Sequence, residues 1–114
     1  MILSYDGLMI IYGVENQAAP GEKPVERLVK KVSLRYSRRT VGIRRHYAAL
    51  NAGARVDLLL RTWYRPEVSV QDVAVLPLLG KQYRITLIQV PENMTPPVMD
   101  LTLERLERDY DMSG

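Results

Sequence analysis

DVAVLPLLGKQYRITLIQV, residues 72–90, contains two strand signals separated by a turn signal. Before Gly80, Val73 and Val75 share one face of a strand, and after it Tyr83, Ile85 and Leu87 alternate with Arg84 and Thr86, which is typical of strands that bury one face. LLGKQ around Gly80 is a turn sequence, so the two halves are predicted to form an antiparallel hairpin. The residues expected on its buried face are Val73, Val75, Tyr83, Ile85 and Leu87, and those expected on its outer face are Arg84, Thr86, Ile88 and Val90.

Further strand signals lie on both sides of this hairpin. LMIIYGV (8–14) is rich in β-branched and aromatic residues, and ARVDLLLRTW (54–63) places Val56, Leu58 and Leu60 on one face. VMDLTLERLE (98–107) alternates apolar and polar residues and is predicted to be the last strand. Its apolar positions are Met99, Leu101 and Leu103.

The run VERLVKKVSLRY (25–36) fits two structures. Val25, Leu28, Val29 and Val32 would share one face of a helix, whereas Val32, Leu34 and Tyr36 alternate as in a strand. We favour a strand for its second half.

One short inserted helix is predicted at about residues 41–51. Its signals are Thr40 as N-cap, the apolar face of Ile43, Tyr47 and Leu50, and Gly53 as the end. The predicted fold class is therefore mainly β, a small antiparallel β-barrel of five to six strands with this helix inserted, because closing the sheet removes its edges. Leu59, Ile88 and Val90 leave apolar residues on outer faces, which indicates subunit contacts.

Composition fits one folded domain over residues 1–114, with an exposed loop at about 15–24 and an acidic tail at about 107–114. The chain is 46% hydrophobic and 25% charged, unlike a disordered protein. It contains no cysteine, so neither a disulfide nor a thiolate nucleophile is available. The first residues lack the features of a signal peptide, and the apolar runs are too short for a membrane span. We expect a protein with no membrane partner.

Charge is unevenly distributed along the chain. Residues 27–56 hold nine Lys and Arg and no Asp or Glu, whereas the remaining residues hold seven basic and 13 acidic side chains. Such segregation suits either a self-assembling subunit or a protein that binds a polyanion.

The centre of the basic segment is RYSRRTVGIRRHY, residues 35–47. It is either a solvated face or a surface for a partner anion, because guanidinium groups bind carboxylates and phosphates in a bidentate manner. The candidate basic contacts are Arg35, Arg38, Arg39, Arg44 and Arg45. Candidate acidic contacts near the C-terminus are Glu104, Glu107, Asp109 and Asp111, and candidate interface anchors beside Pro66 are Trp63, Tyr64 and Arg65.

The sequence supplies little for catalysis, and we expect no enzyme, no cofactor and no metal site. His46 is the single histidine, no Gly-x-Ser-x-Gly elbow accompanies it, and phosphate-binding glycine motifs are absent. The dispersed carboxylates Asp6, Asp57, Asp72 and Asp100 are interpreted as turn, cap and surface acids.

The order of these segments resembles the small head-closure and head–tail connector proteins of tailed bacteriophages over about residues 8–106. In that family an aromatic-alanine helix with a glycine end precedes an apolar strand, and a Gly-Lys-x-Tyr-x-Ile hairpin follows. The matching positions here are Tyr47, Ala48, Ala49, Gly53, Gly80, Lys81, Tyr83 and Ile85.

The resemblance implies a structural subunit of a homo-oligomeric neck ring, assembled in the host cytoplasm and resident at the head–tail junction of the virion. It implies as partners the portal and adaptor proteins, the tail or tail-terminator proteins, and genomic double-stranded DNA that passes without sequence-specific contact. The arginines are then expected at a ring contact, on a connector partner or toward the DNA channel. The alternative is a free nucleic-acid-binding small β-barrel, whose binding would weaken steeply with salt.

Overall fold

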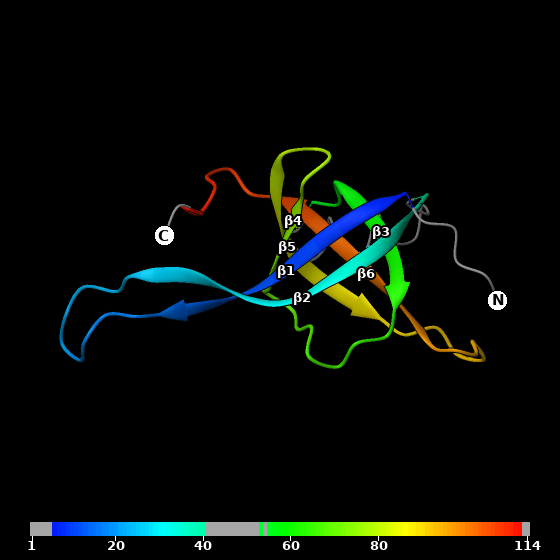
Figure 1. Ribbon diagram of the computed structural model, residues 1–114, viewed down its shortest axis with the longest axis horizontal. Coiled ribbons are helices and arrows are strands. Elements are labelled where there is room, and N and C mark those ends of the chain that lie inside the picture. Colours follow the sequence, from blue (N-terminus) through cyan, green and yellow to red (C-terminus); the bar gives the residue numbers. More distant parts are fainter. Residues whose placement is uncertain (1–5, 41–52, 54, 113–114) are drawn as a thin grey trace.

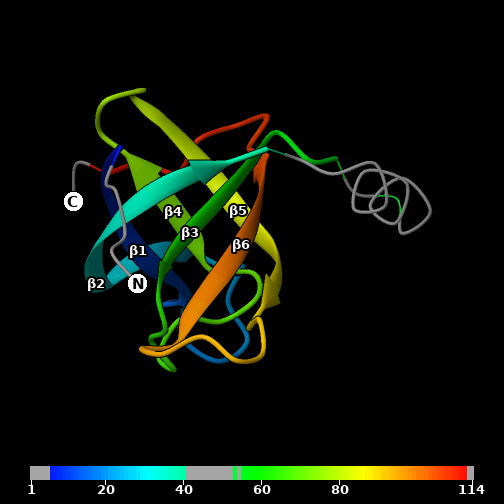
Figure 2. The ribbon, with the colours of Figure 1, turned by 90° about the vertical axis from the view of Figure 1, so that its right-hand side faces the viewer.

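The computed structural model describes residues 6–40, 53 and 55–112, and within them six antiparallel strands close into a barrel (Figure 1 and Figure 2). Neighbouring strands follow the order β1-β2-β3-β6-β5-β4, and β4 pairs back onto β1. The strands are β1 (Gly7–Asn16), β2 (Glu26–Arg39), β3 (Leu58–Trp63), β4 (Val73–Leu76), β5 (Lys81–Gln89) and β6 (Val98–Arg105). The small antiparallel barrel predicted from the sequence is confirmed, whereas the helix expected at about 41–51 lies outside the described residues.

The predicted hairpin is β4–β5, with Val73 opposite Arg84 and Leu76 opposite Lys81. Gly80 closes its turn at φ 63°, where a residue without Cβ is favoured, and donates its N–H to the Leu76 carbonyl oxygen at 2.9 Å. The strand predicted for the second half of the run 25–36 is confirmed, and the first half, for which the sequence also allowed a helix, belongs to the same strand. Strand β2 begins at Glu26 because its ladder with β1 extends along the whole of the run.

The core fills the inside of the barrel with side chains from all six strands. Alternate residues point inward, so each strand contributes two or three apolar side chains to one continuous cluster. The fully buried members include Met9, Ile11, Leu60, Leu76, Ile85, Met99, Leu101 and Leu103. At about 25 cal/mol per Å² of apolar area, this cluster is the main source of the stability of the barrel.

A bulge in β5 changes which residues face the core. Ile85 is opposite Leu103 and Leu87 is opposite Thr102, so Thr86 is an extra residue. Because strand side chains alternate, one extra residue reverses the faces beyond it. Leu87 is therefore 40% exposed and Ile88 packs against the core, the reverse of the sequence-based prediction.

The outer face of β3 and β6 exposes less apolar surface than the sequence predicted. Leu59 was expected to leave apolar surface there, but it is only 7% exposed and lies opposite Thr102. In the next row Arg61 binds Asp100 directly across the ladder, with its Nε 2.7 Å from Oδ1 and its Nη2 3.0 Å from Oδ2. This bidentate pair fixes the register of two central strands.

Strands β1 and β2 continue beyond the barrel as a two-stranded projection, residues 12–30, which we call the arm (Figure 1). The pairing of β1 with β4 ends at Tyr12, and the pairing of β2 with β3 covers only residues 37–39. The molecule consequently measures 48 Å along the arm direction but 30 and 25 Å across it. Two residues of the predicted loop, Glu15 and Asn16, belong to β1, and the tip comprises residues 17–25.

Candidate interaction surfaces

Three of the predicted basic contacts lie together at one end of the barrel. Arg35, Arg38 and Arg39 are exposed in the last five residues of β2. Because β2 runs antiparallel to β1 and β3, the beginnings of both of those strands lie at the same end, which we call the arginine end. Arg44 and Arg45 lie outside the described residues.

The fold brings an acid to this basic run, which contains none in its own sequence. Asp6 Oδ2 accepts a hydrogen bond of 2.7 Å from the backbone N–H of Arg38, 32 positions away, and the Asp6 N–H donates to the Tyr36 carbonyl oxygen at 2.7 Å. Burial raises the pKa of Tyr36, Arg38 lowers it and Asp6 raises it. The sequence did not reveal this partner because strand register, not proximity in the chain, places it there.

Exposed leucines share the arginine end. Leu8 lies opposite Arg35 in the ladder and is 43% exposed, while Leu78 and Leu79 in the β4–β5 turn are 74% and 41% exposed. A Cβ atom built on Gly7 would lie 3.1 Å from Leu78 Cδ1, so the turn packs directly beside the start of β1. Arginine is enriched at the centre of protein interfaces, and the exposed leucines add apolar surface beside it.

The predicted aromatic anchors lie at the opposite end of the barrel. Trp63 ends β3 and is half-buried, and Tyr64 is 42% exposed. Leu59, the ladder partner of Arg39, is four residues from Trp63, which corresponds to about 13 Å along a strand. The described arginines and these aromatics therefore do not line one groove, as they do in proteins that stack single-stranded bases.

Arg65 is held by an acid of its own loop. Its Nε and Nη2 donate to the two carboxylate oxygens of Glu67 at 2.9 and 3.3 Å. This hydrogen bonding raises the pKa of Arg65 and lowers the pKa of Glu67. A partner that binds Arg65 has to compete with this pair.

The predicted acidic contacts are interleaved with arginines. Glu104 is half-buried opposite Arg84, and Glu107, Asp109 and Asp111 are exposed. A cavity of about 280 Å³ at the arginine end is lined by Arg84, Glu104, Arg105, Leu106, Glu107 and Arg108. The surface around it carries both signs of charge, so the acidic patch expected from the sequence is broken by basic side chains.

The segment after β6 is fixed to the barrel by a glutamine that the sequence did not single out. Gln82 Nε2 donates to the Tyr110 carbonyl oxygen at 2.9 Å, and the Tyr110 N–H donates to Gln82 Oε1 at 2.8 Å. The Tyr110 hydroxyl then donates to Glu26 Oε2 in the arm at 3.0 Å. Residues 106–112, which we call the tail, thus connect β5 to the outer part of the arm, next to its tip.

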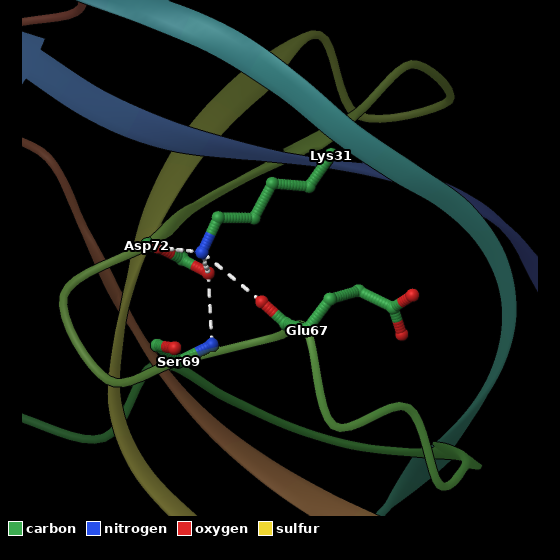
Figure 3. A network of polar contacts seen from close by, with 4 residues as sticks. All are labelled: Lys31, Glu67, Ser69 and Asp72. Atoms are coloured by element: carbon green, nitrogen blue, oxygen red, sulfur yellow. Dashed lines mark hydrogen bonds and ion pairs between the residues drawn. The ribbon is translucent and has the colours of Figure 1, made fainter.

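A second connection reaches the arm from another loop (Figure 3). Lys31 is the extra residue of a bulge in β2, because Ile11 is opposite Val32 while Tyr12 is opposite Lys30. Lys31 Nζ donates to Asp72 Oδ1 and Oδ2 at 3.1 and 2.8 Å and to the Glu67 carbonyl oxygen at 3.0 Å. Asp72 Oδ2 also accepts the Ser69 N–H at 2.8 Å, so the loop before β4 is closed around this ion pair.

Gly13 makes room for this lysine. A Cβ built on Gly13 would lie 2.9 Å from Lys31 Cε, so the side chain lies directly across β1. Bulges commonly redirect a side chain, and here the bulge directs Lys31 to the loop at the point where the arm leaves the barrel.

The four carboxylates considered for acid–base chemistry are each engaged in structural contacts. Asp6 binds the Arg38 N–H, Asp72 binds Lys31 and Asp100 binds Arg61. Asp57 pairs with Arg55 at 3.0 Å and accepts the Arg105 N–H at 2.7 Å. Among the described residues no group of three or more His, Cys, Asp or Glu side chains is placed to hold a metal ion. His46 lies outside them.

Comparison with known proteins finds a solved structure with a similar fold. The chain matches no protein-family model and no curated protein. The solution structure of protein SF1141 from Shigella flexneri 2a, a structural genomics target, is similar with a TM-score of 0.62 and 14% sequence identity. The similarity covers 92% of this chain and 96% of that one. In the part of the chain that the structure describes, there is no helix long and apolar enough to cross a membrane.

Proposed function

We propose that this protein is a structural subunit of a bacteriophage head–tail connector, forming a homo-oligomeric ring below the portal and adaptor proteins and providing the docking surface for the tail. In this role the subunit catalyses no reaction and resides in the virion at the head–tail junction. The proposal begins with the order of the predicted segments and the Gly80–Ile85 hairpin motif, which resemble that family.

One structural observation supports the proposal most strongly: a closed barrel carries an arm that is held to the rest of the molecule at two points. Lys31 binds Asp72 where the arm leaves the barrel, and Tyr110 of the tail binds Glu26 next to the tip of the arm. A fixed projection needs little further ordering when it contacts a neighbour, so more of the contact energy appears as affinity. Such a projection suits a subunit of an assembly.

The arginine end supplies a second surface. It combines Arg35, Arg38 and Arg39 with the exposed Leu8 and, in the β4–β5 turn, Leu78 and Leu79. In a ring this surface is expected to contact a neighbouring subunit, a connector partner or the DNA in the channel. Contacts to DNA would be to phosphates and hence independent of sequence.

Electron microscopy tests the proposal. The purified protein is imaged alone and after mixing with the portal and adaptor proteins of the same phage. Rings, or a new layer of density below the portal, are the expected result. A protein that stays monomeric with these partners and binds DNA with an affinity that falls steeply with salt would instead be the free nucleic-acid-binding barrel.

A further inference from the structure

The arm has two strand edges that pair with no further strand in the described structure, and the tail contacts the arm through the Glu26 side chain. Beyond Tyr12, β1 pairs only with β2, and from Glu26 to Tyr36, β2 pairs only with β1. Unpaired strand edges present rows of N–H and C=O groups that readily pair with another chain. An isolated two-stranded ribbon is also only marginally stable in water.

The ladder register identifies which backbone N–H and C=O groups of the arm point outward and can pair with another chain. The Gln17 N–H donates to the Val25 carbonyl oxygen, so this residue pair directs its backbone groups toward each other. Because such groups alternate along an antiparallel ladder, Glu26, Leu28 and Lys30 direct theirs away from β1. By the same alternation, Val14 and Asn16 direct theirs away from β2.

We infer that the arm joins adjacent copies of this protein, the outer edge of β2 in one copy pairing with the outer edge of β1 in the next. This inference rests on the proposed ring. Copies related by rotation about a ring axis have their arms in the same orientation, so β2 of one copy and β1 of the next are antiparallel. Every arm then uses both of its edges, and the arms form one continuous antiparallel sheet.

The side chains select a register for this contact. When Leu28 lies opposite Val14 of the next copy, two apolar side chains meet, and Arg27 lies opposite Glu15. Opposite charges directly across a ladder stabilise it, and the Leu28 and Glu26 backbone groups face those of Val14 and Asn16. The intramolecular ladder already uses this register, with Val14 opposite Leu28 and Glu15 opposite Arg27.

A second copy could also pair through β2 alone, about a two-fold axis at Leu28, which would place Glu26 opposite Lys30. That arrangement leaves the β1 edge of each arm unpaired and stops at a dimer, so head-to-tail pairing is the better solution for an arm with two open edges.

Crosslinking between two single-cysteine variants tests the inference, because the natural chain contains no cysteine. Val14→Cys and Leu28→Cys are prepared separately, mixed, and treated with a short bis-maleimide crosslinker. The expected product is a dimer that joins residue 14 of one copy to residue 28 of another, identified by peptide mass spectrometry. Neither variant alone should yield it, because equivalent residues of adjacent arms are separated by an intervening strand.

Several outcomes would overturn the inference. A strong dimer from Leu28→Cys alone would show the two-fold arrangement, and the lack of any crosslink in a sample whose oligomers are visible by gel filtration would exclude the arm contact. A protein that remains monomeric and uncrosslinked at every concentration and with connector partners also overturns it. Rings without the 14–28 product refute the arm contact but leave the proposed function standing. The 14–28 product from a protein absent from virions refutes the proposed function and leaves the arm contact standing.

The substitution Leu28→Pro tests the arm contact by a measurement that does not depend on crosslinking. Proline removes an N–H that points away from β1, so the intramolecular ladder keeps its hydrogen bonds and the melting temperature should stay close to that of wild type. The concentration at which half of the protein is assembled should rise about tenfold, as expected for the loss of one hydrogen bond per contact. Leu28→Val, the matched control that retains the N–H and most of the apolar volume, should assemble like wild type. Unchanged assembly of Leu28→Pro would refute the edge pairing.

Discussion

The ion pair between Lys31 and Asp72 is predicted to stabilise the junction between the arm and the barrel. Asp72 is 6% exposed as a residue, and the Lys31 side chain is 30% exposed. The substitution Asp72→Asn retains the shape of the side chain but removes its charge. Asn also offers a single oxygen where the carboxylate accepts the lysine with two.

The expected magnitude follows from the contacts that are weakened. A hydrogen bond to a charged group contributes roughly 1.5–3 kcal/mol, against about 1 kcal/mol for a neutral one. Lys31 keeps the Glu67 carbonyl, and the Ser69 N–H keeps an acceptor if the amide oxygen takes that place. We therefore expect Asp72→Asn to lower the free energy of unfolding by about 2 kcal/mol and the melting temperature by about 8 °C in a chain of this size.

Urea denaturation of the two single variants and their combination provides the assay. Lys31→Met should cost a similar amount, and the double variant should cost less than the sum of the two because both remove the same interaction. Glu67→Gln is the matched control, since its exposed side-chain pair with Arg65 lies in the same loop and should contribute nothing measurable. A loss below about 0.5 kcal/mol for Asp72→Asn, or strictly additive single effects, would refute the assignment.

Three further predictions concern the arm, the tail and the buried Tyr36. Gly13→Ala should displace the Lys31 side chain, because its Cβ would lie 2.9 Å from Lys31 Cε, and amide hydrogen exchange in the arm should accelerate while the barrel stays protected. Gln82→Ala should release Tyr110, and digestion by carboxypeptidase should then remove the tail faster than in wild type. Burial raises the pKa of Tyr36 above its ordinary value of 10.0, so its contribution to stability should be complete below pH 10 and lost as pH rises through the folded pKa. Tyr36→Phe should flatten this alkaline decline in melting temperature, and an unchanged decline would count against the raised pKa.

The positions of the strands were largely predictable because alternation and turn residues are local signals. The hairpin around Gly80 and the last strand from Val98 were both found at the predicted places. The first half of β2 was not, because Val25, Leu28 and Val29 also satisfy a helical spacing. Pairing with β1 decides that choice, and such pairing joins residues that are far apart in the sequence.

The contacts of the candidate surfaces were harder to predict for the same reason. Asp6 reaches Arg38, and Tyr110 reaches Glu26 across 84 positions, so neither partner is visible in the charge pattern of its own segment. The charge map predicted an arginine surface and an acidic one. The fold adds Asp6 to the arginine surface and Arg84 to the acidic one, and the charge pattern along the chain predicted neither neighbour.

The two bulges show why a residue pattern alone does not determine these surfaces. Each inserts one residue, Lys31 in β2 and Thr86 in β5, without a sequence signal of its own. The bulge at Thr86 moves Ile88 into the core and Leu87 to the surface. The bulge at Lys31 directs a cation to Asp72 at the point where β1 and β2 leave the barrel. The position of one unpaired residue in each strand therefore determines which side chains a partner meets and how the arm is fixed to the barrel.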